Sequence, residues 1–178
     1  TGNDLEIYHD ASHSYITDGG TGNLKIGGSQ VDILGTSETM ATFVDDGAVT
    51  LYHNNVAKVA TTANGLTVTG TALATTDTDT SNTGTVDLDF AAKQNFVLTL
   101  TGNITSLTAS NEQVGQSGFI AFIQDGTGSR TVSLHGDYET AATAGLTLTA
   151  TAAAVDLVPY VVIAASRILL GTPQLAFG

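Results

Sequence analysis

The sequence contains no cysteine, no tryptophan, one methionine and only 2 prolines. Without cysteine no disulfide framework can form, so the fold must be stabilised by packing or by association of chains. Long runs of the helix-favouring residues Glu, Lys, Leu and Arg are also missing. Threonine, valine and 20 glycines are abundant instead, and these residues favour pleated strands joined by tight turns. The composition therefore predicts an all-β fold.

Positive charge is scarce, with 5 Lys and Arg against 17 Asp and Glu and a net charge of −12. Phosphate backbones and anionic membrane surfaces are bound by clustered basic residues, so we expect no nucleic-acid partner and no membrane association. The most apolar stretch, residues 155–170, is interrupted by Asp156, Pro159 and Arg167, which argues against membrane insertion. The chain is also too hydrophobic, at 42%, to be disordered by composition.

An internal repeat occupies the N-terminal part of the chain. The segment LEIYHD at residues 5–10 returns as VTLYHN at 49–54, and GNLKIGG at 22–28 returns as NGLTVTG at 64–70. A degenerate third unit lies at residues 31–44 and ends in the turn at residues 45–47. Each unit predicts two alternating strands with a narrow apolar face. Such a hairpin is not stable alone, so it must stack as a solenoid or join two other chains in an intertwined trimer.

The chain is predicted to have three segments: a β-hairpin stem over residues 1–74, a polar linker over 75–85 and a C-terminal domain over 86–178. The linker, TTDTDTSNTGT, lacks large apolar side chains. About eight short strands follow it, with hairpin turns at residues 102–103 and 125–128, and this spacing is typical of a β-sandwich or jelly-roll-like domain. The side chains predicted to be buried are Leu5, Ile7, Leu24, Ile26, Leu51, Val68, Leu98, Leu100, Phe119, Phe122, Val132, Val161 and Ile168.

Two incomplete sets of metal ligands are present, and we predict neither a metal site nor a cofactor. His9 and His13 would share a strand face if the strand continued between them, and three chains could then bring imidazoles to one axis. His9 and His53 also occupy the same repeat position, which explains them without a metal. Asp77 and Asp79 match the first spacings of a calcium loop, but no Glu closes that loop.

One compact polar cluster, formed by His135, Asp137, Tyr138 and Glu139, is predicted to follow a strand in the C-terminal domain. Polysaccharide cleavage would need paired carboxylates in a cleft, and neither a nucleophile elbow nor a phosphate loop is present, so we predict no enzymatic activity. Exposed loops with aromatic and hydrogen-bonding groups suit receptor binding, and Tyr138 is the best-placed aromatic residue. Loops at 111–113 and 125–130 are further candidates. Ordinary turn chemistry and solvent exposure also explain these loops.

Two groups of segments resemble a known family. DLEIYHDASHSYITDGGTGNLKIGG and AVTLYHNNVAKVATTANGLTVTG resemble repeats in tail-fibre and related structural proteins of marine phages, cyanophages especially. NFVLTLTGNITSLT, GQSGFIAFIQDGTGSRTVSL and VDLVPYVVIAASRILLG resemble a β-rich C-terminal domain of phage tail fibres. The resemblance implies a fibrous homotrimer on the virion with a distal domain near the host surface. It carries over no functional residue.

The sequence therefore favours a structural virion fibre protein, the C-terminal part of a tail fibre that takes part in host-surface attachment. It would be made in the cytoplasm of the infected host and lie outside the cell on the virion. Its partners would be other copies in a homotrimer, other virion tail proteins, and a host surface glycan or protein. The alternatives are a purely structural or capsid-borne fibre module, a tailspike-type polysaccharide depolymerase, and a trimeric bacterial adhesin.

Overall fold

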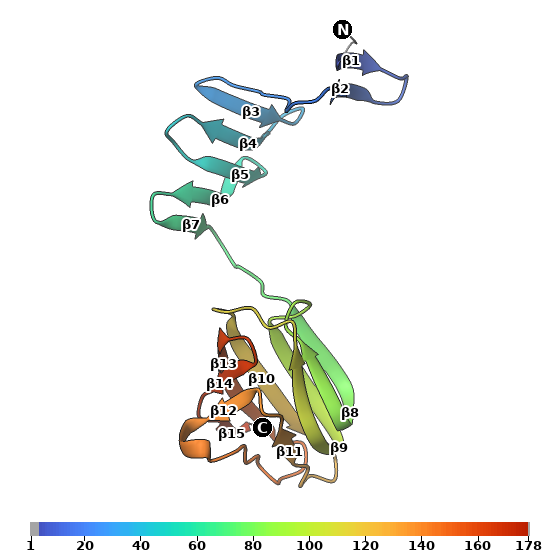
Figure 1. The fold of residues 1–178 in the computed structure, drawn as a ribbon, viewed down its shortest axis with the longest axis vertical. Helices are drawn as coiled ribbons and strands as arrows, with labels where there is room; N and C mark the ends of the chain where they lie inside the picture. The colour runs from blue at the N-terminus through green and yellow to red at the C-terminus, as the bar shows by residue number, and fades with distance from the viewer. Residues whose placement is uncertain (1–3, 178) are drawn as a thin grey trace. The chain divides into compact units, whose positions relative to one another are not determined.

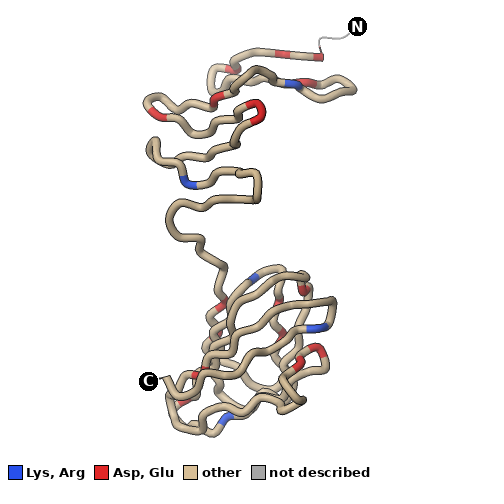
Figure 2. The backbone as a smooth tube through the Cα atoms, turned by 90° about the vertical axis from the view of Figure 1, so that its left-hand side faces the viewer, with Lys and Arg blue, Asp and Glu red and all other residues tan. Residues whose placement is uncertain are grey.

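A computed structural model describes residues 4–177 (Figure 1). Within this range there are fifteen strands, one short 3₁₀ turn and no α-helix, which confirms the predicted all-β class. No helix among these residues has the length and hydrophobicity to cross a membrane. The chain divides into two units, the first ending at Ala72 and the second beginning at Leu73. Charged residues are sparse along the backbone of both units (Figure 2).

The N-terminal unit contains one hairpin and one antiparallel meander. In the hairpin, β1 (Leu5–His9) pairs with β2 (Ser14–Asp18). The meander has the order β3-β4-β5-β6-β7. Its strands are β3 (Gln30–Leu34), β4 (Thr39–Val44), β5 (Val49–His53), β6 (Val56–Thr62) and β7 (Gly65–Val68). The strand predicted within residues 22–28 does not form, because this glycine-rich segment has no strand beside it to pair with.

Side chains and backbone conformation fix the turns of this unit. The Asp10 carboxylate accepts hydrogen bonds from two amides of the β1–β2 turn, at 2.9 and 2.7 Å, and from the Tyr15 hydroxyl at 2.9 Å. Tyr15 also stacks on Tyr8, its cross-strand partner, with ring centroids 4.7 Å apart. The β5–β6 turn consists of Asn54 and Asn55, which have φ values of 51° and 59°. Asparagine tolerates this left-handed region, so the pair suits a two-residue hairpin turn.

The N-terminal unit leaves its large apolar side chains exposed. Ala41 is the one buried hydrophobic residue between positions 4 and 72. In the single chain, six stem residues predicted to be buried are 42% to 75% exposed, and these are Leu5, Ile7, Leu24, Ile26, Leu51 and Val68. The physical reason is that the hairpin and the meander are single layers, and no second layer of the same unit covers them.

The C-terminal unit is one hydrogen-bonded set of eight strands. The path is β11-β9-β10-β13-β14-β12, with β8 beside β9 and β15 beside β13. Four of these pairings, β8–β9, β9–β10, β9–β11 and β12–β14, are parallel. The strands are β8 (Thr76–Asp89), β9 (Asn95–Ser110), β10 (Ser117–Gln124), β11 (Val132–Leu134), β12 (Tyr138–Thr140), β13 (Val155–Ala164), β14 (Arg167–Leu170) and β15 (Gln174–Phe177).

The ribbon formed by β8 and β9 folds back on itself near its midpoint. A fully extended strand of 14 residues, the length of β8, spans about 46 Å. However, the Gln94 amide, five residues after the end of β8, donates a 2.9 Å hydrogen bond to the Thr75 carbonyl just before its start. Five residues reach at most about 18 Å, so the two ends of β8 lie close together. The first half of β9 then pairs with β10 and its second half with β11, which gives a sandwich-like domain.

The predicted turn at Gly102 and Asn103 is therefore a bend within one strand rather than a hairpin. At the same level the β8–β9 register shifts around Asn82 and Gly84. A Cβ atom on Gly102 would meet the Thr83 side chain, so glycine allows the two strands to approach closely at the bend. The turn at residues 125–128 is likewise not a hairpin, because β9 lies between β10 and β11.

Residues 76–85, predicted as part of a linker, form the first part of β8 instead. Threonine alternates with polar residues here, and threonine suits a strand whose backbone groups are paired by a neighbour. That neighbour is β9, which lies beyond the segment in sequence and supplies the pairing that composition does not reveal. The segment that connects the two units is shorter than the predicted linker and lies before it in the sequence. Because β7 ends at Val68 and β8 begins at Thr76, residues 69–75 form this connection.

Inward-pointing side chains of the C-terminal unit form one hydrophobic core of sixteen buried residues. Burial is confirmed for five predicted residues, Leu98, Leu100, Phe122, Val132 and Ile168. Phe119 is only half-buried. For Val161, 37% exposed, the prediction is wrong, because alternation along β13 directs Tyr160 and Val162 into the core and Val161 outward.

We predict that Gly102→Ala destabilises the C-terminal unit, because the added methyl group collides with Thr83 inside the bend. Overpacking of this kind costs about 1–3 kcal/mol, measured as the free energy of unfolding in urea. Gly136→Ala is the matched control, since a Cβ atom at that position meets no atom within 4 Å. Equal stability of the two variants would contradict the role of Gly102.

Candidate ligand-binding site

The predicted polar cluster lies at the start of β12, which runs parallel to β14. Alternation along β12 directs Tyr138 into the core, where its exposed fraction is 7%. Its hydroxyl donates a 3.1 Å hydrogen bond to the Thr108 carbonyl, and burial raises the pKa of Tyr138 well above its ordinary value. The prediction of Tyr138 as an exposed contact residue is therefore wrong. A core position explains this aromatic residue without a ligand.

Two ion pairs hold the outward-pointing groups of the cluster. His135 Nδ1 lies 2.6 Å from the Asp137 carboxylate. The Arg167 guanidinium donates two hydrogen bonds to the Glu139 carboxylate, at 2.6 and 2.9 Å. These bonds lower the pKa of Glu139 and raise that of Arg167. The sequence prediction missed Arg167, which lies 28 residues further along the chain; its isolated positive charge in an apolar strand is the signal that an acidic partner is near.

His135, Tyr138 and Glu139 line one surface pocket together with residues from the segment that follows. The pocket has a volume of about 410 Å³, and its other lining residues are Leu134, Gly136, Thr140, Thr143 and Gly145. Asp137 is not among the lining residues and acts on the pocket through His135. The structure thus brings three of the four predicted residues to one pocket, whose volume lies in the range of small-ligand sites.

A strained segment separates this pocket from a smaller apolar one. The 3₁₀ turn η1 (Ala141–Thr143) contains Ala142 and Thr143 with φ values of 53° and 55°. Left-handed backbone is unfavourable for both residues, and such conformations are often found at binding sites. Thr140 and Gly145 line both hollows, and the second one is completed by apolar groups such as Leu146 and Pro173.

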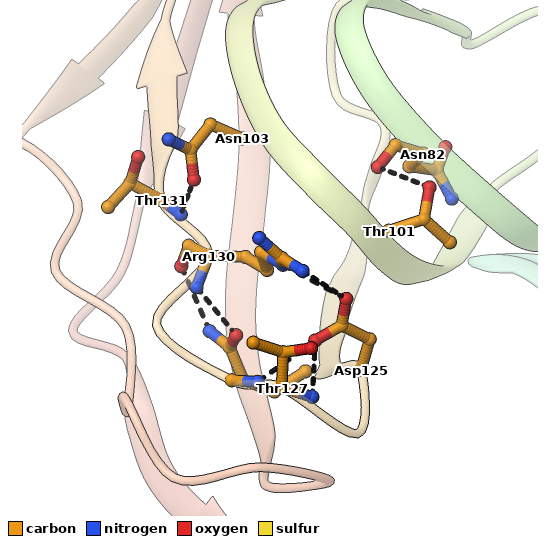
Figure 3. Close-up of polar contacts among 9 residues, drawn as sticks. Asn82, Thr101, Asn103, Asp125, Thr127, Arg130 and Thr131 are labelled. Atoms are coloured by element: carbon orange, nitrogen blue, oxygen red, sulfur yellow. Dashed lines mark hydrogen bonds and ion pairs between the residues drawn. The ribbon is translucent and has the colours of Figure 1, made fainter.

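The loop at residues 125–130, another predicted recognition element, uses its polar groups internally (Figure 3). The Asp125 carboxylate accepts hydrogen bonds from the amides of Thr127 and Gly128, both at 2.9 Å, and from the Arg130 guanidinium at 2.9 and 2.7 Å. The buried Gln124 side chain accepts from the Arg130 amide and donates to the Arg130 carbonyl. These contacts explain the loop as a structural element of the fold.

Polar groups also fix the nearby bend of the β8–β9 ribbon, and Figure 3 includes two of these contacts. The buried Asn82 amide donates hydrogen bonds to the carbonyls of Asp79 and Thr99, at 3.0 and 3.1 Å, while the Thr101 hydroxyl donates to the Asn82 carbonyl at 3.4 Å. The Asn103 side chain accepts from the Thr131 amide at 3.1 Å. The sequence prediction assigned no role to Asn82, because it lies in the segment predicted as a linker.

Between residues 4 and 177, no group of three or more His, Cys, Asp or Glu side chains could hold a metal ion. The condition for a histidine site fails because β1 ends at His9, so His13 lies in the turn rather than on the same strand face. Asp77 and Asp79 lie within β8 rather than in a calcium-type loop. The carboxylates of the pocket cluster are each held by a neighbouring His or Arg, and this arrangement suits hydrogen bonding and ion pairing.

We predict that Asp125→Asn lowers the melting temperature at pH 7 and that this effect disappears in acid. Hydrogen bonds from Arg130 lower the pKa of Asp125 below its ordinary value of 3.8. A lowered pKa stabilises the folded chain above the ordinary pKa, and that contribution is lost as the pH falls through the folded-state value. The measurement is thermal unfolding at pH 7 and at about pH 2.5, with Asp79→Asn as a control. An effect of equal size at both pH values would contradict the ionic role of Asp125.

Comparison with protein families matches residues 75–163, from just before β8 into β13, to the family described as "Putative phage tail fibre C-terminal domain". The match covers 89 of the 178 residues, half of the chain. Searches of curated proteins and of solved structures found no match. The matched range contains the β8–β9 ribbon, β10 and most of β13, which build the core, and also the His135–Glu139 cluster. The chain therefore belongs to the phage tail fibre C-terminal domain family.

Proposed function

We propose that this chain is a structural segment of a tail fibre that forms a homotrimer and takes part in attachment to the host surface. Family membership supports a virion-associated, structural role rather than a catalytic one. The observation that carries the homotrimer is an uncovered apolar face on the meander of the N-terminal unit. The pocket beside β12 supports the attachment role.

The meander has an apolar row of side chains on one face and a mainly polar row on the other. Strand register aligns five apolar residues in one row across all its strands, and these are Ile33, Ala41, Leu51, Val59 and Val68. The neighbouring row, on the opposite face, consists of Asp32, Thr42, Thr50, Ala60 and Thr67. A sheet with such a face is stable when another layer covers it. No second layer exists within residues 4–72, and other copies of the chain would supply one.

Burial of the apolar row on association would contribute favourable free energy to this arrangement. Fully burying a large aliphatic side chain contributes about 1.5–3 kcal/mol. Ile33, Leu51 and Val68, in one row, are each between 42% and 48% exposed in the single chain. Three chains around one axis would each contribute such a row.

We predict that the full chain sediments as a trimer at micromolar concentration and that Leu51→Asp converts it to monomers. The substitution places a charge at the centre of the apolar row, where burial would require its desolvation. Thr50→Asp is the matched control, because it adds the same charge on the opposite face of the same strand. A folded monomer of the unmodified chain would contradict the homotrimer.

Host attachment is assigned to the pocket lined by His135 and Glu139. Its exposed carboxylate and imidazole groups, and the Arg167 guanidinium paired with Glu139, can exchange hydrogen bonds with the hydroxyl, amide or acidic groups of a surface glycan. Most aromatic residues of the C-terminal unit offer a poor alternative, since Phe90, Phe96, Phe122, Tyr138 and Tyr160 are in the core. The two others, the half-buried Phe119 and the exposed Phe177, do not line the pocket. A polar ligand that binds through hydrogen bonds and ion pairs therefore suits this pocket best.

We predict that Glu139→Gln weakens glycan binding by the full chain at least about tenfold, because charge-assisted hydrogen bonds contribute about 1.5–3 kcal/mol. The measurement uses labelled protein on an array of bacterial surface polysaccharides. Arg130→Ala is the control, since it also removes an ion pair but lies in the 125–130 loop, outside the pocket. Unchanged binding by Glu139→Gln would exclude this pocket. No binding by the unmodified chain would favour a purely structural fibre segment.

A further inference from the structure

The sheet at the centre of the C-terminal unit is apolar on both of its faces. The inward side chains of β10 and β13, such as Ile120, Phe122, Val158 and Val162, are in the core. The outward side chains are also apolar, and we call this set the outer face: Phe119, Ala121 and Ile123 on β10, with Val155, Leu157, Pro159, Val161 and Ile163 on β13. A sheet that faces water on one side normally alternates apolar and polar residues, and here that alternation is missing.

The outer face is continuous across the two strands. Strand register places Phe119 beside Pro159 and Ala121 beside Leu157. Towards one end of β13, Val161 and Ile163 are 37% and 40% exposed. A shallow hollow in the same region is lined by Pro159, Val161 and Leu169 among others. Of the outer face, Pro159, Val161 and Ile163 are exposed, Ala121 is buried and the other side chains are half-buried. None of these side chains belongs to the core.

Charge is absent from the outer face although the unit is acidic. Residues 73–178 contain nine acidic and three basic side chains, a net charge of −6 with histidine neutral. The first half of β9, the whole of β10 and the outward positions of β13 carry none of them, and the one acidic residue of β13, Asp156, is buried on the inner side. The Glu139–Arg167 pair lies at the edge, on β12 and β14. An uncharged apolar centre with a charged edge is the anatomy of a protein–protein interface.

We propose that the outer face is an interface between copies of this chain. Two copies carry the same net negative charge and repel each other, so close contact is favoured where neither presents charge. The outer face meets this condition. A glycan ligand fits the outer face poorly, because none of the eight side chains that define this face has a hydrogen-bonding group. This inference rests on the proposed homotrimer and adds a second contact, located in a different unit from the meander.

The absence of cysteine from the sequence gives a direct test in the full chain. Val161→Cys places a single thiol on the outer face, and Ser133→Cys places one at an exposed position of β11. Each thiol is labelled with a maleimide in the native protein, and each rate is divided by the rate in urea. Sedimentation of the same samples gives the oligomeric state. We expect an assembled chain in which Val161→Cys is labelled at least about tenfold more slowly than Ser133→Cys, because the interface excludes the reagent.

Three results would overturn this interface. Equal labelling rates in a chain that sediments as a trimer would exclude the outer face and leave the homotrimer through the meander intact. Slow labelling of Val161→Cys in a monomeric chain would show that the fold of the single chain, and not an interface, protects this position. Fast labelling in a monomeric chain would exclude both this interface and the proposed homotrimer.

Discussion

The C-terminal unit depends on a sharp bend that β8 and β9 make together. Because the two strands are paired along most of their length, neither can bend alone without losing backbone hydrogen bonds. The absence of a side chain at Gly102 allows close approach at the bend, and Asn82 and Asn103 provide polar contacts that backbone pairing does not supply there. The bend directs one half of β9 towards β10 and the other towards β11, and the core forms between them.

Structural features that depend on the local residue pattern were predicted correctly from the sequence. The predictions failed for segments whose structure depends on pairing with a strand far away in the chain. Composition and alternation predicted the all-β class and most strands of the meander. The linker prediction failed because residues 76–85 become a strand only when β9, later in the chain, pairs with them. The turn prediction at Gly102 failed for a related reason: glycine suits a hairpin turn and a close strand approach equally well, and only the position of Thr83 distinguishes the two.

For the candidate site, the sequence identified the right segment but not the role of each residue. Clustered titratable groups marked residues 135–139, and three of them line one pocket. The orientation of Tyr138 followed from the pairing of β12 with β14, which a segment of only three strand residues does not reveal. The same pairing brings Arg167 to Glu139 across 28 residues of sequence. Sequence proximity therefore located the pocket, and sheet topology decided which groups face the solvent.

The two units differ in how many hydrophobic side chains they bury. The C-terminal unit encloses a core of sixteen residues, whereas the N-terminal unit, as a single layer, has one buried hydrophobic residue within positions 4–72. A short connection of residues 69–75 joins them, and seven residues span at most about 25 Å. In the proposed homotrimer, contact between the C-terminal units would confine the N-terminal units of the chains to a small shared volume. The local concentration of the meanders would then reach the millimolar range that short tethers give, so that even weak contacts between them would form as if within one molecule.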